Sequence, residues 1–115
     1  MPTKYAVIDI ETTGGQPKRD KIIEIGIVLY DGEKETGRYE TLIDPGYSIP
    51  PQITRLTGIT GAMVADAPKF YEVARDIVEW TQDAVFVAHN VRFDYNFIRE
   101  EFARLGYTYT RKQLC

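Results

Sequence analysis

Apolar residues follow two different spacings along this chain. Short runs rich in β-branched residues, bounded by Gly, Pro or Asp, are typical of buried strands. Longer segments carry apolar residues three and four positions apart, which predicts amphipathic helices. Strands are expected within residues 5–14 and at residues 22–30, 36–43, 84–88 and 107–110. Helices or single helical turns are expected at residues 52–57, 60–64, 69–82 and 91–105.

Short polar signals mark the borders of the two long helices. Asp66-Ala67-Pro68 resembles a helix start, Asn90 is a good N-cap, and Gly106 fits the position after a helix end. The side chains expected to face the core are Phe70, Val73, Ala74, Ile77, Val78 and Trp80 in the first helix and Phe93, Phe97, Ile98, Phe102 and Leu105 in the second.

The connections between strands predict the sheet topology. Asp31-Gly32 is a hairpin signal, so the first three strands are expected to form an antiparallel meander. The fourth and fifth strands flank a helix, which implies a parallel pair. The predicted fold class is therefore α/β, a mixed sheet with flanking helices. An opening meander disfavours a receiver-like or flavodoxin-like domain, because those folds open with β-α-β.

Composition narrows the classes of protein that this chain can represent. Its 115 residues suffice for one small domain, and no apolar run reaches the length of a membrane span. The net charge of −3 argues mildly against holding nucleic acid by bulk electrostatics. The single cysteine, Cys115, excludes an internal disulfide and a cysteine-based zinc site. Together with a start that leads directly into a strand, it favours a cytoplasmic protein with no membrane partner.

Two carboxylates stand at the end of the first strand. Side chains alternate between the faces of a strand, so Asp9 and Glu11 are expected on the same side, roughly 6–7 Å apart at Cα. They would repel each other unless a cation lay between them, and Mg²⁺ and Mn²⁺ prefer oxygen ligands. The alternative is that both are solvated residues where the strand leaves the core.

A third carboxylate, Asp94, falls in the first turn of the helix that follows the fourth strand. If that strand runs parallel to the first and beside it, Asp94 arrives near Asp9 and Glu11, because ligands sit at the carboxyl ends of parallel strands. Three carboxylates suit a pair of divalent metals about 4 Å apart. The alternative is that Asp94 only supports the N-terminus of its helix.

Three motifs carry a family resemblance that covers the whole chain. Asp-Ile-Glu-Thr-Thr-Gly at 9–14, Leu-Thr-Gly-Ile-Thr at 56–60 and His-Asn-Val-Arg-Phe-Asp at 89–94 resemble the DnaQ-like 3′–5′ exonucleases. These are DEDD nucleases of RNase H-like fold, which include the epsilon proofreading subunit and the exonuclease domains of bacterial replicative polymerases.

The resemblance implies roles for matching positions. Asp9, Glu11 and Asp94 would be the catalytic metal ligands, for two ions of Mg²⁺ or Mn²⁺ in the complete family site. The positions that would contact the 3′-terminal nucleotide are Thr12, Thr13, Leu56, Thr57, Asn90 and Phe93. For Leu56 and Phe93, ordinary core packing remains the alternative.

The family also requires a further motif, a general-base histidine followed by a fourth aspartate, and the 115 residues do not contain it. His89 is the only histidine, and the match places it in the motif at residues 89–94, where a structural role is expected. We therefore interpret residues 1–115 as the N-terminal part of a single exonuclease domain. Losing the base typically costs ~10²–10⁴ in rate, so weak or no activity is expected. The sheet face left uncovered is expected to promote self-association.

The resemblance implies a 3′–5′ exonuclease that hydrolyses nucleic acid, with DNA as the expected substrate, and releases nucleoside monophosphates. Its expected role is proofreading or repair. Its partners would be a single-stranded 3′ end and DNA polymerase subunits. The alternative is a non-catalytic module of the same fold that binds nucleic acid ends. The residues leave the choice between DNA and RNA open.

Overall fold

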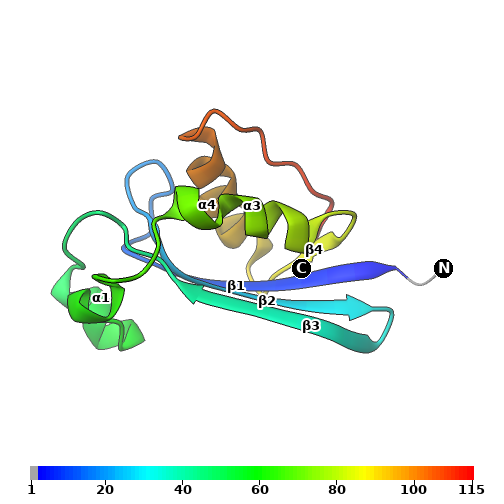
Figure 1. Cartoon of the computed structure of the whole chain (residues 1–115), viewed down its shortest axis with the longest axis horizontal. Coiled ribbons are helices and arrows are strands. Elements are labelled where there is room, and N and C mark those ends of the chain that lie inside the picture. Colours follow the sequence, from blue (N-terminus) through cyan, green and yellow to red (C-terminus); the bar gives the residue numbers. More distant parts are fainter. Residues whose placement is uncertain (1–2) are drawn as a thin grey trace.

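A five-stranded sheet with two long helices on one face forms the body of the protein (Figure 1). The computed structural model describes residues 3–115. The strands lie in the order β3-β2-β1-β4-β5. Their bounds are β1 Lys4–Thr12, β2 Ile22–Asp31, β3 Lys34–Leu42, β4 Val85–Val87 and β5 Gln113–Leu114. The helices are α1 Pro51–Thr57, α2 Gly61–Val64, α3 Phe70–Thr81 and α4 Val91–Ala103.

The predicted mixed topology is confirmed. β1, β2 and β3 form an antiparallel meander, whereas β4 pairs in parallel with β1 and β5 pairs in parallel with β4. β4 is only three residues long, and its pairing with β1 ends at Val7↔Val87. The second half of β1 therefore continues past the end of β4, where the first turn of α4 comes in.

The main core lies between the sheet and the helices α3 and α4. It receives Ile8 and Ile10 from β1, Ile77 from α3 and Phe97 and Ile98 from α4, all nearly inaccessible. Figure 1 shows both long helices on the same side of the sheet. A second, smaller cluster holds α1 and α2 at the end of the sheet, and it consists of Ile23, Ile49, Ile59 and Val64.

The prediction of a fifth strand at residues 107–110 is wrong. The pairing with β4 begins only at Lys112, whose carbonyl accepts the Phe86 N–H at 2.7 Å. The preceding segment is held by side chains instead: the Tyr95 hydroxyl donates to the Tyr109 carbonyl at 3.2 Å and accepts the Arg111 N–H at 3.0 Å. Alternating Tyr and Thr residues gave a strand-like pattern, but these bonds hold the segment without strand pairing, and the buried Tyr109 ring stacks on Phe102 with centroids 4.8 Å apart.

One prediction at a helix border fails. Leu105 was expected in the core, but α4 ends at Ala103 and Leu105 is 46% exposed. The helix predicted at residues 69–82 is confirmed as α3, with Lys69 and Gln82 as its caps, and the Glu72 side chain accepts the Lys69 N–H at 2.9 Å at its start.

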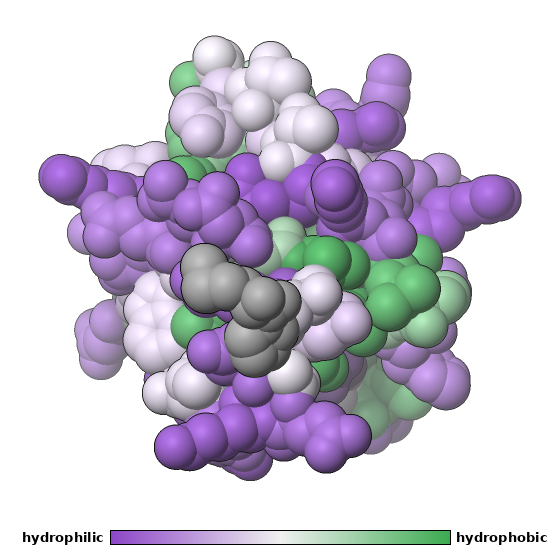
Figure 2. Space-filling view, turned by 90° about the vertical axis from the view of Figure 1, so that its right-hand side faces the viewer, coloured by the Kyte–Doolittle hydropathy of each residue, from purple (hydrophilic) through white to green (hydrophobic). Residues whose placement is uncertain are grey.

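The surface at the end of the molecule where β1 starts is mainly hydrophilic, with one hydrophobic area on its right-hand side (Figure 2). Within residues 3–115, every helix is too short or too polar to cross a membrane.

Candidate active site

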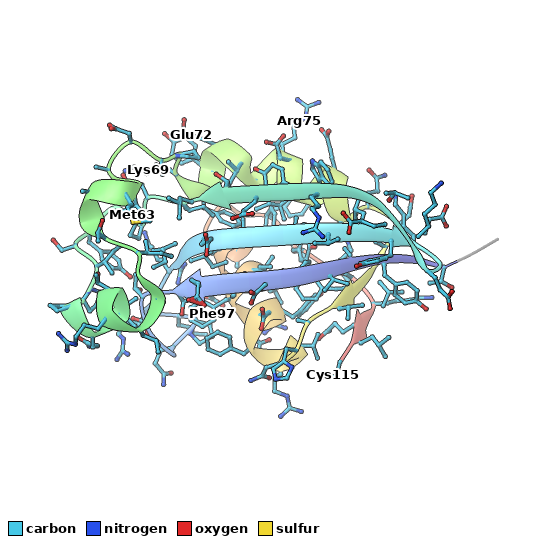
Figure 3. The ribbon with its side chains drawn as sticks, turned by 90° about the horizontal axis from the view of Figure 1, so that it is seen from below. Met63, Lys69, Glu72, Arg75, Phe97 and Cys115 are labelled. Carbon is cyan, nitrogen blue, oxygen red and sulfur yellow. The ribbon has the colours of Figure 1, made fainter. Side chains whose placement is uncertain are left out.

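The face of the sheet opposite to α3 and α4 carries the carboxylates of the first motif. In β1 the buried Ile8 and Ile10 alternate with Asp9, which is exposed, and Glu11, which is half-buried. Asp9 and Glu11 therefore share the face that α3 and α4 do not cover. Figure 3 looks onto this face and shows β1, β2 and β3 side by side in front of those helices, with α1 and α2 at one end.

Two further glutamates lie on the same face. Glu24 of β2 stands directly opposite Glu11, and Glu40 of β3 is opposite Gly26, which in turn is opposite Asp9. A shallow depression is lined by Asp9, Glu24, Gly26 and Glu40 together with Ile10. Neither Glu24 nor Glu40 belongs to the motifs from which the site was predicted. A single charge inside the apolar run 22–30 was the available signal for Glu24.

Burial and mutual repulsion act on these carboxylates. Burial, followed by the charges of Asp9 and Glu24, raises the pKa of Glu11 above its ordinary value. Burial, followed by Glu40 and Asp9, raises the pKa of Glu24. This face therefore favours a bound cation, which would relieve the repulsion.

Asp94 is buried in the first turn of α4, close enough to Asp9 to be affected by its charge. Burial, and then repulsion by Asp9, raises the pKa of the Asp94 carboxyl to about 6, against the opposing effect of the backbone N–H groups of Asp94 and Ile10 and of His89. Ile10 lies beyond the end of the β1–β4 pairing, so its N–H is available to a side chain. The short β4 thus allows α4 to bring a carboxylate to the edge of β1.

The chemistry of these donors fits a divalent cation, because hard cations prefer carboxylate oxygens and a bound ion would offset the raised pKa values. Asp9 influences both Glu11 and Asp94. Within residues 3–115, however, no three side chains of His, Cys, Asp or Glu stand close enough together to form a ready metal cage. The assignment of Asp9, Glu11 and Asp94 to one metal centre stays a prediction.

The residues after Glu11 form a tightly bonded turn. The Thr12 hydroxyl donates to the Gly14 carbonyl at 2.6 Å, and both Thr12 and Thr13 are buried. A Cβ on Gly14 would lie only 2.4 Å from the Asp20 carboxylate, whose Oδ2 accepts the Gln16 N–H at 2.9 Å. The glycine of the first motif is therefore required by the close approach of Asp20.

Leu56 and Thr57, from the middle motif, lie on α1 at the end of the open face. Leu56 is 81% exposed, so the core-packing alternative is wrong for this residue. The Thr57 hydroxyl donates to the Ile53 carbonyl at 2.8 Å and accepts the Ile59 N–H at 3.1 Å, which fixes the end of the helix. The hydrogen bonds of Thr57 therefore fix the last turn of α1, on which Leu56 is exposed to solvent.

Residues of the last motif surround the start of α4. Phe93 is half-buried, packs on the core and lies against Phe97 with ring centroids 4.8 Å apart. Asn90 occupies the N-cap position and is exposed, but its side chain makes no capping hydrogen bond. His89 is also exposed.

Comparison with known proteins identifies the family. Residues 6–114 match the sequence profile of a family described as RNase_T, exonuclease. The chain belongs to this exonuclease family. A 3′–5′ exonuclease DinG of Staphylococcus haemolyticus is 44% identical over 112 residues, which cover 97% of this chain and 12% of that protein. The DinG exonuclease of Staphylococcus aureus strain USA300 is 42% identical over 110 residues, with 96% and 12% covered.

The exonuclease family also accounts for the fold. A zinc-ion-bound complex of Escherichia coli exonuclease I with single-stranded DNA superimposes with a TM-score of 0.87, at 21% identity, over 99% of this chain and 28% of that one. This likeness shows the RNase H-like exonuclease fold that the sequence motifs predicted. The chain spans only 12% of the length of the two staphylococcal relatives.

Proposed function

We propose that this chain carries part of a divalent-metal-dependent 3′–5′ exonuclease site that releases nucleoside monophosphates from a nucleic acid end. Its support is the electrostatic link between two distant motifs: the charge of Asp9 raises the pKa of Glu11 in the same motif and of Asp94 in α4. Carboxylates that repel each other on an uncovered sheet face are suited to holding Mg²⁺ or Mn²⁺.

Each part of the chain has a role in this proposal. Asp9, Glu11 and Asp94 would hold the ions, which when bound supply an activated water and stabilise the leaving 3′ oxygen. Thr12, Thr13 and Asn90 would contact the terminal nucleotide. The exposed Leu56 and the aromatic Phe93 would lie beside its base, because apolar and aromatic groups bind bases without sequence preference.

Single-stranded DNA is the substrate that we favour, and it is the ligand named for the exonuclease I complex. We further propose that residues 1–115 form the N-terminal part of one exonuclease domain that works in proofreading or repair in the cytoplasm, with DNA polymerase subunits as partners. Without the general-base histidine the chain by itself would cleave slowly. The uncovered sheet face presents the acidic side chains of Asp9, Glu11, Glu24 and Glu40, so it gives no support to the self-association that an apolar face would promote.

The test is cleavage of a 3′-labelled single-stranded DNA by the chain in Mn²⁺. We expect slow release of the labelled mononucleotide, reduced at least about tenfold by Asp9→Ala because a carboxylate that would hold the ions is lost. Asp31→Ala, at the opposite end of the sheet, is the matched control and is expected to leave the rate unchanged. Equal rates for the chain and its Asp9→Ala variant would rule out the metal mechanism.

The second candidate function is a module that binds nucleic acid ends without cleaving them. The observation that favours it is that His89, the only histidine, is exposed at the start of α4 and belongs to the motif at residues 89–94. Binding of the same DNA without any Mn²⁺-dependent cleavage would support this function over hydrolysis.

A further inference from the structure

An exposed aromatic side chain lies beside the first motif, and the family motifs do not include it. Tyr47, in the loop that follows β3, is 44% exposed, and its hydroxyl lies 2.7 Å from the Thr13 hydroxyl. Thr13 follows directly on Glu11 and Thr12 at the end of the carboxylate strand. The hydrogen bond therefore places the Tyr47 ring next to the turn that the proposed function assigns to the terminal nucleotide.

A cation accompanies this ring. The Lys21 ammonium lies 5.8 Å from the centroid of the Tyr47 ring. The Lys21 backbone is tied to the same threonine, since its N–H donates to the Thr13 hydroxyl at 3.0 Å and its carbonyl accepts the Thr13 N–H at 2.9 Å. Tyr47 stays 44% exposed beside this ammonium, so an aromatic ring and a positive charge are presented together.

Hydrogen bonds, an ion pair and a buried side chain hold the loop that carries Tyr47. The Asp44 N–H donates to the Pro68 carbonyl at 2.8 Å, and the Asp44 carboxylate binds the Lys69 ammonium at 2.8 Å. The same carboxylate accepts the Gly46 N–H at 2.8 Å, and Ile49 on the other side is buried in the second core cluster. A fixed aromatic ring loses little entropy when a ligand packs on it.

We propose that Tyr47 and Lys21 form a nucleotide-binding surface that extends the active site: the ring stacks on a base of a single strand, and the ammonium contacts a neighbouring phosphate. Aromatic rings paired with cations bind single strands in this way without reading sequence. The positive charge also offsets the acidic sheet face for an incoming polyanion. The proposal rests on the proposed function, because it assumes that a nucleic acid end reaches Thr13.

Binding of a 5′-fluorescein-labelled oligothymidine by the chain, followed by fluorescence anisotropy in Ca²⁺, tests this surface. We expect Tyr47→Ala to weaken binding about 5-fold to 100-fold, which corresponds to the loss of one stacked base. Tyr47→Phe and Tyr47→Trp keep a ring and should stay within about threefold of the original. Tyr107→Ala is the matched control, since Tyr107 is 45% exposed and lies after α4, packed on Phe102.

The outcomes separate this proposal from the proposed function. If the unaltered chain binds and Tyr47→Ala behaves like Tyr107→Ala, the stacking surface is overturned while end binding stands. If Tyr47→Phe loses as much as Tyr47→Ala, the hydroxyl acts only through Thr13, and stacking is again overturned. If the unaltered chain does not bind, both proposals fail. Tyr47→Leu, which keeps an apolar side chain but no ring, replaces Tyr47→Ala if the alanine variant unfolds at a lower temperature.

Discussion

At the scale of single residues, the site depends on close approaches that leave no room for change. Asp20 is buried, its carboxylate packs against Gly14, and the Arg19 guanidinium and the Gln16 N–H hold its pKa below the ordinary value despite burial. Glu101 is buried as well and accepts the Ile22 N–H at 2.9 Å. These contacts fix the end of β1, where the first motif lies, and the adjacent start of β2.

Gly14 of the first motif and Gly15, which follows it, provide a matched pair of substitutions. We expect Gly14→Ala to lower the free energy of unfolding by about 1–3 kcal/mol, because its Cβ would meet the Asp20 carboxylate at 2.4 Å. Gly15→Ala should leave stability unchanged or raise it by up to about 1 kcal/mol, since nothing lies within 4 Å of a Cβ there and alanine restricts the unfolded chain. Urea denaturation of both variants measures the difference, and equal effects would contradict the role of Asp20.

At the scale of elements, side-chain hydrogen bonds hold the C-terminal segment, because the strands β4 and β5 are too short to hold it by pairing alone. The Arg111 guanidinium donates to the carbonyls of Thr81 at 3.0 Å and Val78 at 3.1 Å, and so caps the last turn of α3. Its carbon lies 4.5 Å from the centroid of the Tyr109 ring, and the Tyr109 hydroxyl lies 2.7 Å from the Thr81 hydroxyl. This network positions the segment before β5, which has only two residues of its own.

Removal of this cap should loosen the C-terminal segment more than the rest of the protein. We expect Arg111→Ala to cost about 1–3 kcal/mol, because two helix carbonyls lose their donor and the Tyr109 ring loses a stacked cation. Hydrogen exchange should accelerate first at the amides of β4 and β5. Lys112→Ala, a neighbouring exposed cation, is the control and should stay within about 0.5 kcal/mol of the original. An equal loss in both variants would contradict the capping role.

At the scale of the whole molecule, the two faces of the sheet differ in role: one packs into the core, and the other carries the proposed catalytic carboxylates. One face packs on α3 and α4 and holds most of the buried apolar side chains, whereas the other presents Asp9, Glu11, Glu24 and Glu40. Asp94 reaches this arrangement from the helix layer, around the edge of β1. The carboxylates are therefore expected to destabilise the metal-free fold, a cost that functional sites commonly carry.

The Asp94→Asn variant tests this trade-off through pH. The pKa of Asp94 is raised from 3.8 to about 6, so its contribution to stability is full below pH 4 and is lost as the pH rises through 6. In EDTA at pH 7.5 we expect the free energy of unfolding of Asp94→Asn to exceed that of the unaltered chain by about 1–3 kcal/mol. At pH 3.5 the two free energies of unfolding should be equal.

Mn²⁺ should raise the melting temperature of the unaltered chain only. Asp66→Asn, at an exposed loop position, serves as control. A variant less stable than the original at pH 7.5 would contradict the raised pKa of Asp94, which burial and then repulsion by Asp9 cause.

The sequence by itself determined the local features and the family. Period-2 alternation placed Asp9 and Glu11 on one face, Asp31-Gly32 announced the hairpin, and the three motifs identified the exonuclease fold, because each of these signals is carried by neighbouring residues. The tertiary structure alone decided what depends on contacts between distant segments. It set the early end of the β1–β4 pairing that admits Asp94, the contact of Tyr47 with Thr13, and the side-chain network that holds Tyr109 outside any strand. Such side-chain hydrogen bonds join residues that are 14 to 34 positions apart, and no local periodicity encodes them.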